Sequence, residues 1–458
     1  MNRMSRSVLC LAAGLTFLAH PAAAQSSPSG HEFRVNSYTT GEQVEPDVSV
    51  NPVNGRFIVV WKAPPSSFCK GQRFNAAGAQ IGGEFFPSAA CPGGIAASMF
   101  VPGGFVVATV DGPDIFARRF VNYGAFSGNY LVNTYTTGNK AGVRLASDTS
   151  GGFVVVWSGA VQDGNGFGVF ARRYIYSGEP AGFLPEFRVN SNTTGDQKGP
   201  AIAMDPAGAF VVVWESALPA VCCPQIEGQR YAATGAPLGS EFRVNSNAAI
   251  GNYFPDVASD TSGNFVVAWT SSPYGAYTYD VFARRFSSSG APLGVTFRVN
   301  TNTNVVAARP RVTRRDTDFV VVWEEQQTDG ASYGVFGRRY APDGSALGSV
   351  FRVNSYTTHD QILPAITSKP DGGFVVVWES DVQDGSMHGV YGQKYCLGGD
   401  ADGNGVVDVA DVFYLINYLF AGGPEPLGCA DVDGSVTLDV ADVFYLINFL
   451  FAHGPAPV

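Results

Sequence analysis

The stretch FVVVW at residues 153–157 decides the fold, because variants of it recur along the chain. The copies are FIVVW (57–61), FVVAT (105–109), FVVVW (153–157), FVVVW (210–214), FVVAW (265–269), FVVVW (319–323) and FVVVW (374–378). Their leading Phe residues are 48, 48, 57, 55, 54 and 55 residues apart, and all six Trp residues of the protein end a copy. Self-similarity at this spacing predicts seven equivalent structural units.

Each unit predicts four short β-strands. Five consecutive β-branched and aromatic residues suit a strand that is covered on both faces, and a glycine-containing turn such as DTSGG (148–152) precedes it. Three further segments recur at the same spacing as this apolar strand. They are an arginine-rich segment such as VFARRY (169–174), the segment FRVN at 33, 187, 242, 297 and 351, and a short segment such as PDVSV (46–50).

Seven such units predict a seven-bladed β-propeller over residues 25–395. A linear solenoid is the alternative, but it would need capping units with polar outer faces, and both ends of this array resemble ordinary repeats. The array starts with a spare FRVN at 33–36 and ends at VYGQKY (390–395) with no FRVN after it. We therefore expect the N-terminal strand to pair with the last blade and close the ring.

Residues 1–24 have the features of a secretory signal peptide. Arg3 and Arg6 precede a short apolar run at 8–19, and small residues at 22–24 form a cleavage site. The run is too short to span a bilayer, so we expect a protein that is secreted or attached to the cell surface, without a membrane span. Without the signal, 27 basic and 39 acidic residues remain. That balance disfavours nucleic acid as a partner and suits cation binding.

A second duplication, at residues 399–424 and 430–455, places oxygen ligands in the spacing of calcium loops. Calcium takes six to eight oxygen ligands, and no other cation suits this set as well. The sequence therefore predicts two Ca²⁺ ions. The predicted ligands of the first are Asp400, Asp402, Asn404, the Val406 carbonyl, Asp408 and Asp411. The predicted ligands of the second are Asp431, Asp433, Ser435, the Thr437 carbonyl, Asp439 and Asp442.

A helix is expected after each loop, in DVFYLINYLF and DVFYLINFLF, and no amphipathic helix precedes either loop. In the first copy, apolar residues at 412, 413, 415, 416, 419 and 420 predict one apolar helix face. A loop followed by a helix, twice, resembles the dockerin type I module, which is related to the EF-hand. We assign residues 396–458 to this dockerin-like domain. The resemblance implies two calcium ions, folding coupled to calcium, and docking of a helix onto a cohesin-like protein.

The loop residues that help dockerins choose a cohesin depart from the cellulosomal pattern. They are the apolar pairs Val409-Ala410 and Val440-Ala441 instead of hydroxyl residues, which puts cellulosome membership in doubt. The predicted partner-binding residues are Val409, Tyr414, Val440 and Tyr445. The alternative is a module that is cross-linked by calcium and that serves to stabilise the protein or to retain it at the cell surface.

Six cysteines follow the signal, an even number that is compatible with disulfides in an exported chain. Cys396 and Cys429 occupy equivalent positions before the two loops, which makes a disulfide between them plausible. Cys69 and Cys91 flank neighbouring blades and are a further candidate pair. Cys222 and Cys223 are adjacent, and their connectivity stays open.

No catalytic constellation stands out, because the four histidines after the signal show no zinc or triad spacing. In SSPYGAYTYD (271–280), the side chains of Tyr274, Tyr277 and Tyr279 suit stacking on sugar rings, although ordinary loop packing would also explain them. We therefore favour a secreted, non-enzymatic binding protein whose propeller presents a protein- or glycan-binding surface. The alternative is an extracellular polysaccharide-active enzyme, a glycoside hydrolase or lyase with a dockerin.

Overall fold

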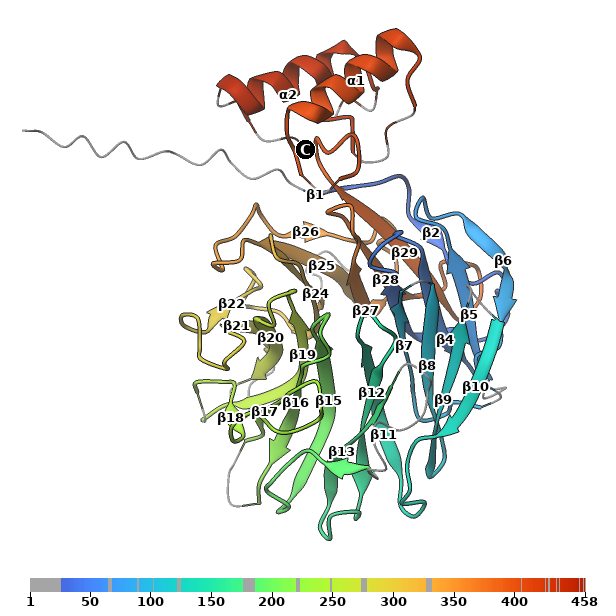
Figure 1. The fold of residues 1–458 in the computed structure, drawn as a ribbon, viewed down its shortest axis with the longest axis vertical. Coiled ribbons are helices and arrows are strands. Elements are labelled where there is room, and N and C mark those ends of the chain that lie inside the picture. Colours follow the sequence, from blue (N-terminus) through green and yellow to red (C-terminus); the bar gives the residue numbers. More distant parts are fainter. Residues whose placement is uncertain are drawn as a thin grey trace, which may run out of the picture.

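The computed structural model describes residues 26–458, except 65–67, 89, 102, 122–124, 176–185, 220–222, 248, 273–277, 327–331, 405, 425, 427–428, 434, 436, 453, 456 and 458. The predicted signal peptide lies outside the described residues. The strands form seven sheets, and α1(Val409–Ala421) and α2(Val440–Ala452) follow them in the chain. In Figure 1 the sheets follow one another around a ring in sequence order, and the helices lie at one end of the molecule. The prediction of a seven-bladed propeller with a small helical C-terminal part is confirmed.

Every blade is an antiparallel sheet whose successive strands run from the inside of the ring outward. Blades 1 to 3 are β3(Val44–Val50), β4(Phe57–Ala63), β5(Phe68–Phe74) and β6(Gln80–Phe85); β7(Ile95–Phe100), β8(Gly104–Asp111), β9(Asp114–Val121) and β10(Ala125–Leu131); and β11(Lys140–Ser147), β12(Phe153–Ala160), β13(Phe167–Tyr174) and β14(Phe187–Arg188).

Blades 4 to 6 repeat this order, and blade 7 takes its outer strands from the N-terminus. They are β15(Asp196–Met204), β16(Phe210–Ala217), β17(Gln225–Tyr231) and β18(Phe242–Arg243); β19(Gly251–Ser259), β20(Phe265–Ser272), β21(Asp280–Phe286) and β22(Phe297–Arg298); β23(Ala307–Arg314), β24(Phe319–Gln326), β25(Tyr333–Tyr340) and β26(Phe351–Arg352); and β27(Gln361–Ser368), β28(Phe374–Asp381), β29(His388–Leu397), β2(Phe33–Arg34) and β1(Ser26–Pro28).

The apolar strands form the core because each buries both of its faces. All six Trp side chains are almost fully buried, and the Phe that opens each apolar strand stacks on the aromatic residue that ends the next strand, as Phe153 does on Tyr174 at 4.5 Å. The apolar clusters lie between blades. One of them joins Val377 of blade 7 to Val59 of blade 1. A single blade therefore cannot bury its surface alone, as expected for a repeat array.

The Asn of FRVN explains why this segment recurs. The Oδ1 atom of Asn190 accepts a hydrogen bond from the buried backbone N–H of Val169 on β13. Asn36 does the same for Val390 on β29 at 2.8 Å. Four other blades contain the same contact, made by Asn133, Asn245, Asn300 and Asn354. Because an unpaired buried N–H is costly, the motif completes the edge of each blade.

The N-terminal segment closes the ring as predicted. Phe33 and Arg34 of β2 pair with β29. The Glu32 carboxylate accepts a hydrogen bond from the N–H of Ser355 in the preceding blade at 2.7 Å. On the other side, the N–H of Ser37 donates to Glu84 of blade 1 at 2.6 Å. The repeated octapeptide thus makes at its N-terminal site the contacts that connect neighbouring blades elsewhere.

The C-terminal module contains α1(Val409–Ala421) and α2(Val440–Ala452), each of 13 residues. The helices pack on one another through a small core that includes Val412, Leu415 and Leu446. Disulfides link Cys396 to Cys429 and Cys69 to Cys91, as the sequence suggested. Cys222 lies outside the described residues. Among the described residues, no helix is long and apolar enough to cross a membrane.

Candidate functional site

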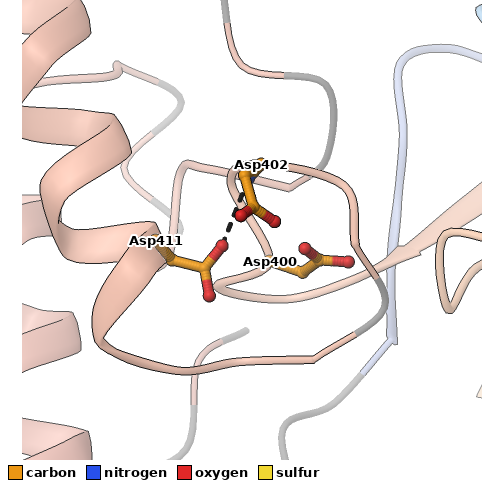
Figure 2. Close-up of side chains that lie close together, drawn as sticks. All are labelled: Asp400, Asp402 and Asp411. Atoms are coloured by element: carbon orange, nitrogen blue, oxygen red, sulfur yellow. Dashed lines mark hydrogen bonds between the residues drawn. The ribbon is translucent and has the colours of Figure 1, made fainter.

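The first acidic loop brings three carboxylates together. Asp400 and Asp402 come from the loop and Asp411 from the first turn of α1, and the three point toward one another (Figure 2). One oxygen from each lies within 4.8 Å of the other two. Asp400 and Asp411 are buried. This cluster, the first triad, has the size and chemistry of a site for one hard cation.

The first triad forms because the loop folds back on the helix start. Both oxygens of Asp411 accept backbone hydrogen bonds, from Ala401 at 2.8 Å and from Asp408 at 2.8 Å. The Asp408 side chain in turn accepts from the N–H of Ala410, so the pair forms a capping box. The N–H of Asn404 donates to Asp400 and to Asp402, each at 3.0 Å. The loop backbone thereby fixes all three carboxylates.

The second loop repeats this arrangement and gives the second triad. Oxygens of Asp431, Asp433 and Asp442 lie within 4.8 Å of one another. The Asp442 carboxylate accepts from the N–H of Val432 at 2.8 Å, as Asp411 does from Ala401. The N–H of Ser435 donates to Asp431 at 3.1 Å and to Asp433 at 2.9 Å. Two loops of different sequence therefore reach the same geometry.

The module has no basic side chain of its own to neutralise these carboxylates. Residues 396–458 contain nine acidic residues and no Lys or Arg. Burial raises the pKa of Asp411, and the negative charge of Asp402 raises it further. Burial and the charge of Asp433 likewise raise the pKa of Asp442. A set of oxygens that repel one another and have no imidazole or thiolate among them fits calcium better than zinc or copper.

The other predicted ligands lie in the same loops but contact backbone. The Asn404 side-chain oxygen accepts from the N–H of Val406 at 2.8 Å. Asp408 and Asp439 cap their helices, Asp439 by accepting from Ala441 at 2.7 Å. The Thr437 carbonyl accepts from the Ser435 hydroxyl at 3.1 Å. The structure therefore assembles the three-carboxylate part of each predicted set, and the remaining ligands stay predictions.

The apolar face predicted for α1 is divided in the structure into a buried part and an exposed part. Val412 and Leu415 point into the module, whereas Phe413, Ile416 and Phe420 are exposed. The exposed apolar residues of the two helices are together called the apolar stripe. Its members are Val409, Phe413, Ile416 and Phe420 on α1, and Val440, Phe444 and Phe451 on α2.

The predicted partner-binding residues divide between these two parts. Val409 and Val440 belong to the apolar stripe. Tyr414 and Tyr445 instead pack half-buried against the core of the module. The spacing of apolar residues alone could not separate the two parts, because both are apolar.

The tyrosines predicted for sugar stacking lie mostly in a segment that the structure leaves undescribed. Tyr274 and Tyr277 fall outside the described residues. Tyr279 is half-buried, and its carbonyl accepts a hydrogen bond from the N–H of Ala307 in the next blade at 2.9 Å. Its backbone therefore joins two blades, and its role in binding stays a prediction.

A carboxylate–imidazole pair on one rim of the propeller was not predicted from the sequence. Oε1 of Glu379 lies 3.0 Å from Nδ1 of His388, and Oε2 accepts from the N–H of Glu45 at 3.1 Å. Burial raises the pKa of Glu379 to about 7. The available signal was the acidic residue directly after the buried Trp, which occurs in three blades, at 215, 324 and 379.

Comparison with known proteins identifies the fold and not a family. No protein-family description matches the sequence, and no curated protein matches it. A crystal structure of a protein of unknown function from Dyadobacter fermentans is similar, with a TM-score of 0.51 and 10% identity, over 81% of this chain and 98% of that chain. At this identity the likeness shows the propeller fold alone.

Two glycan-active enzymes have lower similarity. A polysaccharide lyase of family PL25, an ulvan lyase bound to -[GlcA(1-4)Rha3S]-, has a TM-score of 0.49 and 9% identity over 80% of this chain and 96% of that chain. An α-L-arabinanase from Penicillium chrysogenum, in complex with arabinobiose, has a TM-score of 0.44 and 10% identity, over 67% and 98%. Neither likeness extends beyond the fold.

Proposed function

We propose that this chain is an exported binding protein: its propeller presents a ligand surface, and its C-terminal module attaches it to another protein when calcium is bound. The observation that carries the proposal is the pair of matching carboxylate triads in a segment without Lys or Arg. Such a segment gains stability from a divalent cation, because folding brings like charges within a few ångströms of one another.

Each triad would hold one calcium ion. The ion would supply positive charge and additional coordination to oxygen atoms of the loop. The chain supplies the positioning: Asp411 and Asp442 connect each loop to the first turn of its helix through backbone hydrogen bonds. A bound cation would therefore fix the orientation of both helices, and with it the apolar stripe.

The apolar stripe is the proposed docking surface for a cohesin-like protein. Phe413 and Phe444 occupy equivalent helix positions and are each 65% exposed. Large exposed aromatic side chains on a rigid helix are typical anchors of protein–protein interfaces. The stripe is defined on both helices, so either helix offers a similar surface to a partner.

Isothermal titration calorimetry of the full-length protein tests the calcium part. Two sites are expected for the wild type, one for Asp411→Asn or Asp442→Asn, and none for the double variant. Asp111→Asn, which changes an exposed aspartate at the end of β8, is the matched control and should keep two sites. Absence of any calcium heat or thermal stabilisation in the wild type would overturn the proposal.

A glycan-active enzyme is the second candidate, and the Glu379–His388 pair favours it. A carboxylate beside an imidazole is a common component of general acid–base sites, and the 3.0 Å contact places the two groups within reach of one another. A panel of polysaccharides assayed for reducing ends and for unsaturated products decides between the two functions. Product formation that is lost in His388→Asn would establish the enzyme, whereas retention of a polysaccharide without product would support binding.

A further inference from the structure

Six residues with left-handed backbone surround one mouth of the central channel. Each lies at the bulge in the inner strand of its blade, where the pairing with the apolar strand shifts register. The six, which we call the mouth ring, have φ angles between 49° and 63° and are Glu45, Gly142, Gly199, Phe254, Arg309 and Leu363. A repeated backbone position is thus occupied by glycine in two blades and by a large side chain in four.

The bulge itself does not require these large side chains. Its N–H is held by the residue that follows the buried Trp of the preceding blade: Phe254 donates to Glu215 at 2.7 Å, and Arg309 donates to the hydroxyl of Thr270 at 3.0 Å. The same backbone forms with Gly199, which donates to Ser158 at 3.1 Å. A non-glycine residue in this region costs on the order of 1 kcal/mol.

Five members of the mouth ring, all except Glu45, line a cavity of about 200 Å³, the mouth pocket. Glu215, Arg144 and Arg311 also line it. Phe254 is 46% exposed although it lies in a strained backbone. The guanidinium of Arg309 lies over its ring, 5.2 Å from the ring centroid. A strained backbone position that leaves a large aromatic side chain half exposed is a candidate functional position.

Two cavities share Arg144 and Arg311 but differ in their acidic residues. These arginines line both the mouth pocket and a second cavity of about 340 Å³. Asp47 and Asp256 line only the second cavity, and each accepts a backbone hydrogen bond from the next blade, at 2.8 Å in both cases. Asp256 also forms an ion pair with Arg311, with 3.7 Å between Oδ1 and Nη1. A ligand in the mouth pocket would therefore share Arg311 with Asp256, although neither Asp47 nor Asp256 is among the residues that line that pocket.

The electrostatics of the mouth pocket favour an anion. Arg311 is the main reason that the pKa of Arg144 is lowered to about 10, with burial as the second cause. Burial raises the pKa of Glu215, and the hydrogen bond from the N–H of Phe254 opposes that rise. Arg309 is paired with Glu324 at 2.6 Å. A pocket that gathers several guanidinium groups, in a chain with a formal net charge of −10, offers a selective place for negative charge.

We propose that the mouth pocket binds an anionic sugar residue of a glycan, with the sugar ring against Phe254 and its carboxylate or sulfate on Arg144 and Arg311. Aromatic faces suit sugar rings, and guanidinium groups bind carboxylates and sulfates with matched geometry. The pocket is smaller than the usual range for a drug-sized ligand, about 300–1,000 Å³, so it suits one sugar unit. This inference rests on the proposed role of the propeller as a binding domain and names its ligand class.

The test is calorimetric binding of full-length protein to three oligosaccharides of equal length: oligogalacturonate, a sulfated galactan fragment and a neutral galactan fragment. At least one acidic probe is expected to bind at least tenfold more tightly than the neutral one. Phe254→Gly should weaken that binding at least tenfold while leaving the melting temperature unchanged or raised, because glycine relieves the strained backbone. Arg144→Gln should weaken binding of the acidic probes more than that of the neutral probe.

Val161→Gly is the matched control, because Val161 also has a positive φ of 59° and is exposed, but lies in a loop outside the mouth pocket. It should keep the wild-type affinity. Neutral binding equal to acidic binding, or Phe254→Gly with wild-type affinity, would overturn the mouth pocket and leave the proposed binding role intact. No binding of any glycan by a protein that still takes up two calcium ions would overturn the glycan ligand itself.

Discussion

The propeller and the C-terminal module are both built by duplication, but they obtain their stability differently. Seven blades bury apolar strands against one another, and the ring of inner strands closes where β27 contacts β3. The module has only two copies, a core of eight buried apolar residues among those described, and a disulfide from Cys396 to Cys429. Domains of this size need additional stabilisation, such as a disulfide or a bound metal ion. The propeller also carries a disulfide, Cys69–Cys91, but its seven copies close into a ring in which every blade packs against two neighbours. Two copies cannot form such a ring.

Calcium removal should give the largest effect, confined to the module. Each saturated site adds about 4 kcal/mol when free calcium is about 1,000 times its dissociation constant. Differential scanning calorimetry of the full-length protein with excess EDTA should shift a low-enthalpy transition downward and leave the large propeller transition in place. A propeller transition that moved equally would contradict the division of the molecule into two independently stabilised parts.

Removal of residues 25–36 should be the next largest effect, confined to the propeller. The truncation exposes the edge of β29 and loses the buried side chains of Val35 and Asn36. The expected loss is at least about 5 kcal/mol. Chemical denaturation monitored by Trp fluorescence measures it.

A peptide of residues 26–40 added in trans provides the control for the truncation. It should restore the stability of the truncated protein, because it supplies the missing strand, whereas a peptide of the same composition in scrambled order should not. A truncated propeller with wild-type stability would show that closure by the N-terminal strand is not needed.

The stability of the propeller should depend on pH through Glu379. Its folded-state pKa is raised from 4.5 to about 7, chiefly by burial, so the folded protein binds more protons than the unfolded chain in this window. The contribution is therefore present below pH 4.5 and is lost as the pH rises through 7. Glu379→Gln should remove it and raise stability at pH 8 by up to about 3 kcal/mol, measured by denaturation between pH 5 and 8.

Glu324→Gln is the matched comparison for Glu379→Gln. Glu324 occupies the same position in blade 6, but it forms an ion pair with Arg309. Loss of its charge leaves that guanidinium without its partner, so stability at pH 8 should fall. The same sign for both variants would show that the ion pair does not distinguish the two blades.

The smallest effect is expected from a comparison of blade 7, where the N-terminal strand closes the ring (the seam), with an interior blade. Asn36→Ala and Asn190→Ala each remove the acceptor of a buried backbone N–H, on Val390 and Val169 respectively. Each should cost about 1–3 kcal/mol by chemical denaturation. Similar values would show that the seam behaves as an ordinary blade. A much smaller loss of stability for Asn36→Ala than for Asn190→Ala would indicate that the pairing of the N-terminal strand with blade 7 opens locally.

The propeller could be predicted from the sequence because its signal is local and repeated. A run such as Phe153–Trp157 has no polar residue, so it must be covered on both faces, and seven copies fix the number of blades. The triads were equally accessible, since Asp400, Asp402 and Asp411 lie within twelve residues. Their convergence to within 4.8 Å follows from one loop and one helix start.

The mouth ring could not be predicted in this way. Phe254 and Arg309 are 55 residues apart and precede prolines that look like ordinary turn residues. Their common backbone conformation depends on the register shift in each inner strand and on a hydrogen bond from the neighbouring blade. The division of the apolar face of α1 into a buried and an exposed part could not be predicted for a related reason. The exposure of Phe413 depends on what packs beside the helix.

The sequence by itself determined the number of blades, the strand that closes the ring and the acidic loops. Each of these features depends on residues that are close together in the sequence or that recur at a regular spacing. Only the tertiary structure decided which side chains meet in the channel. It placed Arg144 and Arg311 in the lining of two cavities, and Asp47 and Asp256 in the lining of only one of them. The physical reason is that a ring brings residues from blades far apart in the sequence to a common axis. The electrostatic field there depends on charges from several blades, so it cannot be read from any single segment.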